Sequence, residues 1–136
     1  MKIVVATNVL VSALIKPGGV PAQLLGHNSP FNMVTTEEIL AELERVLHYD
    51  RLQKRYHLSH ELIAAYVNQV RDASEVIEVD SNIKAVEKDP DDDKFVACAR
   101  AAQADCIVSG DPHLTNLKSY HGIPILTPRQ FLEIIA

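Results

Sequence analysis

Apolar and polar positions follow two different repeats along this chain. Short apolar runs rich in β-branched residues are typical of buried strands, and they occur at 2–5, 31–34, 75–79, 106–109 and 123–126. Apolar residues at intervals of three and four predict helices over 7–15, 21–26, 59–73, about 90–103 and 128–135, and a helical turn over 112–117. Strands that alternate with helices predict an α/β fold with a parallel sheet covered on both faces, because parallel strands need crossover connections.

Two predicted helices begin with a capping residue. Thr35 and Glu38 have the spacing of a capping box, in which the hydroxyl and the carboxylate each accept a hydrogen bond from a backbone N–H. Ser59 is placed to cap the helix over 59–73. The helix after Thr35 carries an apolar stripe of Ile39, Leu40, Leu43, Val46 and Leu47.

The chain has 136 residues, which is enough for one domain over 1–136 with a single core of ordinary size. No apolar run approaches ~18 residues, so we expect no membrane-spanning segment. We also expect no secretory leader, because no basic and apolar segment precedes the first strand. Cys98 and Cys106 lie in apolar surroundings without a CxxC spacing, which is typical of buried reduced thiols in a cytoplasmic protein.

The formal net charge is −5, which disfavours a simple electrostatic nucleic-acid binder. It is compatible with an enzyme that gathers carboxylates around cations, because bound ions invert the local charge. The sequence contains no GxGxxG, P-loop, GxSxG or HExxH motif, which excludes several common enzyme classes. We expect His57 and His60 at the surface.

Polar residues collect where the predicted strands end. Ligands of open α/β sheets lie outside the carboxyl ends of the strands, so these residues are candidates for one shared site. The segments at these ends are Ala6-Thr7-Asn8 and Ser109-Gly110-Asp111, and the neighbouring acids are Glu37, Glu38, Glu42, Glu44, Asp89, Asp91, Asp92 and Asp93.

Each group also has a purely structural explanation. Asp89 can cap a helix that begins at Pro90, acids in the first turn favour the helix dipole, and the sequence SGD suits a turn. Helical glutamates are usually solvated, and helical geometry alone does not choose between Glu42 and Glu44. Three acids in one turn nevertheless exceed what capping requires, and their repulsion favours a shared cation. Together the acids indicate a site with oxygen ligands for Mg²⁺ or Mn²⁺.

The chain resembles PIN domains in four segments that follow in family order: VVATNVLVSAL, TEEILAELERVL, DPDDDKFVACARAAQADCIVSGD and IPILTPRQFLEII. It is most similar to the small prokaryotic branch described as toxins of toxin–antitoxin pairs. The resemblance implies a metal-dependent ribonuclease built as a three-layer α/β/α sandwich with strand order 3-2-1-4-5. It also implies an RNA substrate, Mg²⁺ or Mn²⁺ as cofactor, an antitoxin protein as partner, and a homodimer.

The resemblance also implies the roles of individual residues. The family's catalytic metal ligands fall on Glu42, Asp93 and Asp111. The residues that support these ligands fall on Thr7, Asn8 and Ser109. The family's first aspartate, another metal ligand, falls on Ala6. A recent natural loss and a deliberate inactivating substitution both explain this alanine, and both predict a weak or inactive nuclease.

Two other functions stay open at this point. A non-catalytic module that binds RNA or an antitoxin agrees with Ala6 and with the negative charge. A receiver-like phosphoacceptor also gathers aspartates at sheet edges, but its acidic pair after the first strand is missing here.

Overall fold

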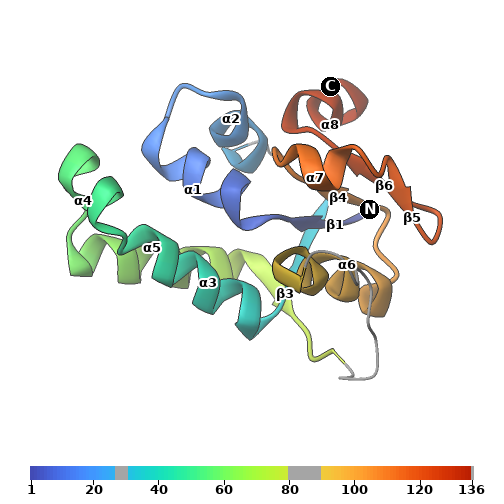
Figure 1. Cartoon of the computed structure of the whole chain (residues 1–136), viewed down its shortest axis with the longest axis horizontal. Coiled ribbons are helices and arrows are strands. Elements are labelled where there is room, and N and C mark those ends of the chain that lie inside the picture. The colour runs from blue at the N-terminus through green and yellow to red at the C-terminus, as the bar shows by residue number, and fades with distance from the viewer. Residues whose placement is uncertain (27–30, 80–89, 136) are drawn as a thin grey trace.

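The computed structural model describes residues 1–26, 31–79 and 90–135, apart from the side chains of residues 24, 26 and 90–93. Figure 1 shows the helices gathered around the strands, with α4 and α6 towards opposite sides of the view. The strands are β1 (Lys2–Val5), β2 (Asn32–Thr35), β3 (Ser74–Val76), β4 (Cys106–Val108), β5 (Ser119–Tyr120) and β6 (Ile123–Leu126). The helices are α1 (Thr7–Ile15), α2 (Val20–Gly26), α3 (Glu37–Leu47), α4 (Asp50–Tyr56), α5 (His60–Ala73), α6 (Pro90–Ala102), α7 (Pro112–Thr115) and α8 (Pro128–Ile135).

Within the described residues, six strands form a sheet in the order β3-β2-β1-β4-β6-β5. β3, β2, β1, β4 and β6 are parallel to their neighbours in this order, and β5 is antiparallel to β6. The predicted α/β fold with a parallel sheet is therefore confirmed. The five parallel strands follow the predicted order 3-2-1-4-5, and the two-residue β5 extends the edge beyond it.

Successive residues of β1 point to opposite faces of the sheet, as strand geometry requires. One face carries the α1-side core, which comprises Ile3, Val5, Val9, Leu10, Val11, Leu40, Leu43, Leu47, Leu58, Ile63, Val67, Val70, Cys106, Val108 and Phe131. The other carries the α6-side core, which comprises Val4, Ala6, Val34, Ile39, Phe95, Val96, Cys98, Ala99, Ala104, Ile107, Leu114, Ile123 and Ile125. Position 6 therefore faces α6.

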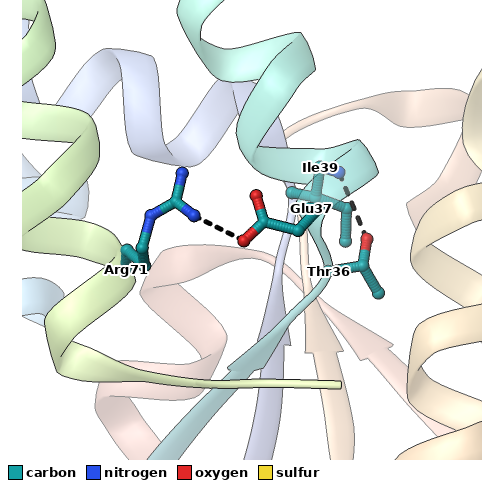
Figure 2. Close-up of polar contacts among 4 residues, drawn as sticks. All are labelled: Thr36, Glu37, Ile39 and Arg71. Carbon is teal, nitrogen blue, oxygen red and sulfur yellow. Dashed lines mark hydrogen bonds and ion pairs between the residues drawn. The ribbon is translucent and has the colours of Figure 1, made fainter. Parts of the chain in front are cut away.

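The start of α3 differs from the predicted capping box by one residue. Thr35 is paired with Val76 in the sheet, so the helix begins after Thr36. Thr36 is the actual N-cap, and its Oγ1 accepts a hydrogen bond from Ile39 N at 3.2 Å. Figure 2 shows this cap beside Glu37, which points to Arg71 of α5 and forms an ion pair with it. The predicted Ser59 cap of α5 is confirmed by a hydrogen bond from Leu62 N to Ser59 Oγ.

Three further elements differ from the expectations: α4 and β5 were not predicted, and β3 is shorter than predicted. The helix α4 was not expected: its sequence, DRLQKRY, has no fully buried residue, and its apolar positions are limited to Leu52 and Tyr56. The strand expected over 75–79 is shorter, since β3 ends at Val76, although Ile77 N still donates to Thr35 O. β5 was not expected from the sequence; it pairs antiparallel with β6 across a turn at His121 and Gly122, whose φ values are 47° and 79°.

Burial raises the pKa of several ionisable side chains in and beside the two cores. Cys98 and Cys106 are free, buried thiols. Burial raises the pKa of Cys98 to about 12, and burial together with the nearby Asp105 charge raises the pKa of Cys106 to about 11. Burial also raises the pKa of Tyr66 to about 12, and its hydroxyl donates to Leu10 O at 2.6 Å. In the described ranges, no helix is long and apolar enough to cross a bilayer.

Candidate functional site

The carboxyl ends of β1 and β4 lie side by side in the sheet. Ala6 N donates to Val108 O at 2.9 Å, and Gly110 N donates to Asn8 Oδ1 at 3.3 Å. These bonds hold the first turn of α1 next to the turn after β4. Ala6 has the extended backbone of an N-cap residue, but its methyl group cannot accept a hydrogen bond from α1.

A pocket of about 190 Å³ opens at this edge of the sheet. Its lining combines the strand ends with α3, α6 and α7, and it consists of Ala6, Thr7, Asn8, Glu42, Phe95, Ser109, Asp111 and Leu114. The structure thus gathers the alanine, two of the expected acidic residues and all three expected supporting residues around one volume. We call it the strand-end pocket.

The structure distinguishes the glutamates of α3, which helical geometry alone did not. Glu42 lines the strand-end pocket, and its side chain is only 17% exposed. Glu37 pairs with Arg71 at the start of the helix (Figure 2) and, with Glu38, lines a separate hollow. The lining of the strand-end pocket does not include Glu44.

Asp111 serves a structural purpose as well as lining the pocket. It is the N-cap of α7, where its Oδ1 accepts a hydrogen bond from His113 N at 2.9 Å. Ser109 is fully buried, and its Oγ accepts from Asp111 N at 3.0 Å. The turn expected from the sequence SGD therefore exists, and it fixes the Asp111 carboxylate at the mouth of the pocket.

Oxygen atoms dominate the polar lining, which suits a hard cation. Glu42 and Asp111 supply carboxylates, and Thr7 is 4% exposed with an Oγ1 that finds no hydrogen-bond partner among the described residues. A buried hydroxyl of this kind normally has a partner. Mg²⁺ commonly takes one or two protein carboxylates and completes its shell with water and phosphate oxygens. The donor set therefore fits Mg²⁺ or Mn²⁺.

The structure describes only part of the acidic loop. Asp89 lies outside the described residues, and the side chains of Asp91, Asp92 and Asp93 lie outside them as well. The backbone places position 93 in the first turn of α6, the helix that also carries Phe95 into the pocket lining. Among the described side chains, no group of three or more His, Cys, Asp or Glu is close enough to hold a metal ion.

Comparison with protein families identifies the fold that carries this pocket. The family model described as "PIN domain" matches residues 2–113. The chain belongs to the PIN-domain family. This membership confirms the predicted family and is at odds with the receiver-like alternative.

Known proteins are similar to this PIN domain in sequence or in fold. An uncharacterized protein of Methanocaldococcus jannaschii is 29% identical over 143 residues, covering 98% of this chain and 90% of its own. VapBC2 from Rickettsia felis, solved bound to a DNA fragment from its promoter, contains a chain with TM-score 0.61 and 16% identity, covering 92% of this chain and 97% of that one. VapC20 of Mycobacterium tuberculosis, described as a Sarcin-Ricin loop cleaving toxin, has TM-score 0.61 and 16% identity, covering 90% and 98%.

Sequence reasoning missed three residues of this PIN-domain site. Phe95 and Leu114 line the strand-end pocket as members of the α6-side core. Lys94 forms an ion pair with Glu42, with Nζ to Oε2 at 2.5 Å. A lysine directly after three consecutive aspartates was a visible signal, but only the fold shows that it reaches a glutamate of α3.

Proposed function

We propose that this PIN domain is a metal-dependent ribonuclease of the toxin–antitoxin type whose activity is impaired by Ala6. The observation that carries the proposal is that Ala6, Glu42 and Asp111 line one pocket at the carboxyl edge of the sheet. The pocket combines carboxylate oxygens with a position that holds a methyl group. Family membership and the VapC-like fold support this assignment.

Glu42, Asp93 and Asp111 are the proposed ligands of Mg²⁺ or Mn²⁺. A bound divalent ion supplies positive charge that neutralises the phosphodiester oxygens and favours deprotonation of an attacking water. Ser109 positions Asp111, because Ser109 Oγ accepts a hydrogen bond from the backbone N–H of Asp111. Asn8 Oδ1 accepts a hydrogen bond from Gly110 N and so holds the turn after β4 against α1. Thr7 contributes a buried hydroxyl to the pocket lining.

Ala6 accounts for the expected loss of activity. Its side chain is buried in the lining, so an aspartate there would place its carboxylate beside Glu42 and Asp111. Loss of a hydrogen-bonding partner behind a metal ligand already costs about 10- to 100-fold in metal affinity or activity. Loss of a direct ligand should cost at least as much.

The proposed substrate is RNA, and the proposed partner is an antitoxin protein. VapC20 is described as cleaving the Sarcin-Ricin loop, and VapBC2 is a complex that binds promoter DNA. Both are similar to this chain in fold. A cytoplasmic location and a homodimer stay predictions of the sequence and its resemblance.

The test is cleavage of a mixed single-stranded RNA pool by the unmodified chain and by the variants Ala6→Asp, Ala6→Asn and Ala6→Asp/Asp111→Asn. We expect Ala6→Asp to raise cleavage by about 100-fold or more in Mg²⁺ or Mn²⁺, and EDTA to abolish it. Asn at position 6 caps α1 as well as Asp does but adds no charge, so Ala6→Asn should stay inactive. Asp111→Asn keeps an acceptor for the α7 cap and removes only the charge.

One result would transfer the function to the non-catalytic alternative. If Ala6→Asp binds Mn²⁺ well, remains folded and still cleaves no RNA in the pool, the nuclease proposal fails. A module that binds RNA or an antitoxin without cutting would then explain the fold and the pocket.

A further inference from the structure

Lys94 is an unusually buried lysine beside the strand-end pocket. Its side chain is 8% exposed, and its Nζ lies 2.5 Å from Oε2 of Glu42. The ammonium also lies 5.2 Å from the ring centroid of Phe95, which lines the same pocket. Ammonium groups are rarely this buried unless they are paired, because leaving water is costly.

The Lys94–Glu42 pair joins the two helices that flank the pocket. Glu42 comes from α3 and Lys94 from α6, so the ion pair fixes the Glu42 carboxylate relative to the helix that carries Asp93 in its first turn. It also gives one of the two described carboxylates of the pocket a positive partner before any metal ion arrives. The ammonium therefore stands where an approaching divalent ion would interact with Glu42.

We propose that Lys94 is the resident cation of this site: it holds and neutralises Glu42 in the metal-free protein, and divalent metal binds in competition with it. This inference rests on the proposed metal site at Glu42 and Asp111. It adds a positioning residue that acts through Glu42. Divalent affinity is then set by the difference between what the ion gains at Glu42 and what the lysine loses there.

A neighbouring hollow offers the displaced ammonium a place to go. Lys94 lies between the strand-end pocket and a larger hollow of about 630 Å³, whose lining includes Lys94 together with Glu37, Glu38 and Glu78. A lysine side chain has a flexible four-carbon stem, so its ammonium can move a few ångströms without moving the backbone. The acidic lining would stabilise the positive charge after it leaves Glu42.

The test is Mn²⁺ affinity, measured by calorimetry on the full chain. Lys94→Met is introduced both into the chain with Ala6 and into the Ala6→Asp variant. We expect Mn²⁺ to bind about tenfold more tightly when the competing charge is removed. A purely structural lysine would give the opposite result, because its loss would release Glu42 and weaken binding. Affinity that stays the same or falls in Lys94→Met would overturn the proposal.

Two matched variants separate competition from other effects. Lys94→Arg keeps a cation in the same place and should keep the affinity of its parent. Lys54→Met removes an exposed lysine of α4 and changes the net charge equally, so it should also leave Mn²⁺ affinity unchanged. A gain in Lys54→Met as large as that in Lys94→Met would attribute the effect to net charge and would overturn the proposal.

Thermal unfolding guards against a folding defect and distinguishes the two proposals. Mn²⁺ should raise the unfolding midpoint of Lys94→Met more than that of its parent, because ligand stabilisation grows with affinity. If no variant binds Mn²⁺, including Ala6→Asp, then the metal site itself fails and the competition fails with it. If Ala6→Asp binds Mn²⁺ and Lys94→Met adds nothing to it, only the role of Lys94 is rejected.

Discussion

The two faces of β1 both carry small or branched apolar residues, but they serve different purposes. On one face, Ile3 and Val5 enter the α1-side core, which is closed by apolar side chains of α1, α3, α5 and α8. On the other, Val4 and Ala6 enter the α6-side core, whose edge opens into the strand-end pocket. Ala6 is 2% exposed and so is a core residue and a pocket residue at once. The fold therefore accepts alanine at a position where the proposed chemistry requires a carboxylate.

The largest expected effect tests whether the two faces are separable. Leu43 is fully buried in the α1-side core, one residue from Glu42 on α3. Leu43→Ala should lower the free energy of unfolding by about 2–5 kcal/mol, because it removes apolar contacts and leaves a cavity. Asp111→Asn should change it by much less, since an asparagine caps α7 equally well. Chemical denaturation measures both.

Mn²⁺ binding should show the reverse order in the same variants. In the Ala6→Asp background, Asp111→Asn should weaken Mn²⁺ binding strongly, whereas Leu43→Ala should leave it unchanged wherever the protein is still folded. Equal losses in both variants would show that the closed core and the pocket are one cooperative unit.

A smaller effect uses the one thiol that each core contains. Cys98 lies in the α6-side core and Cys106 in the α1-side core, and burial raises their pKa values from 9.0 to about 12 and about 11. A raised folded pKa means that the unfolded chain releases its thiol protons first. The stability contributed by the protonated thiols is thus complete below pH 9 and is lost as the pH rises towards 11 and 12.

Above pH 9, each thiol should steepen the fall in unfolding free energy by up to about 1.4 kcal/mol per pH unit. Cys98→Ala and Cys106→Ala should each reduce that slope, whatever they do to stability at neutral pH. Denaturation between about pH 8 and about pH 10.5 measures it. A slope that neither substitution changes would show that the thiols are not buried in solution.

Much of the fold was predictable because its signals are local. The strand over 123–126, the helices over 7–15 and 128–135, and the cap at Ser59 follow directly from apolar repeats and capping chemistry. Structure escaped prediction where no local signal existed. The helix α4 has no fully buried side chain, and β5 has two residues. The N-cap of α3 is Thr36 and not the predicted Thr35, because the pairing of Thr35 with Val76 in the sheet outweighed its local capping preference.

The candidate site was predictable to a different degree. The resemblance to PIN domains supplied Glu42 and the unusual alanine, whereas helical geometry alone did not separate Glu42 from Glu44. No pattern in the sequence could pair Lys94 with Glu42, because the contact depends on how α3 and α6 pack across the edge of the sheet. Long-range ion pairs of this kind are set by tertiary structure and leave no periodic trace.

We propose that position 6 is the missing ligand position of a divalent-cation site, and Mn²⁺ titration by calorimetry tests this proposal. The comparison is between the unmodified chain, Ala6→Asp and the uncharged control Ala6→Asn. We predict that Ala6→Asp binds Mn²⁺ at least about tenfold more tightly than the other two, which bind it equally weakly. Equal affinity in all three, or an equal gain with asparagine, would contradict the claim, because position 6 would then contribute no charged ligand.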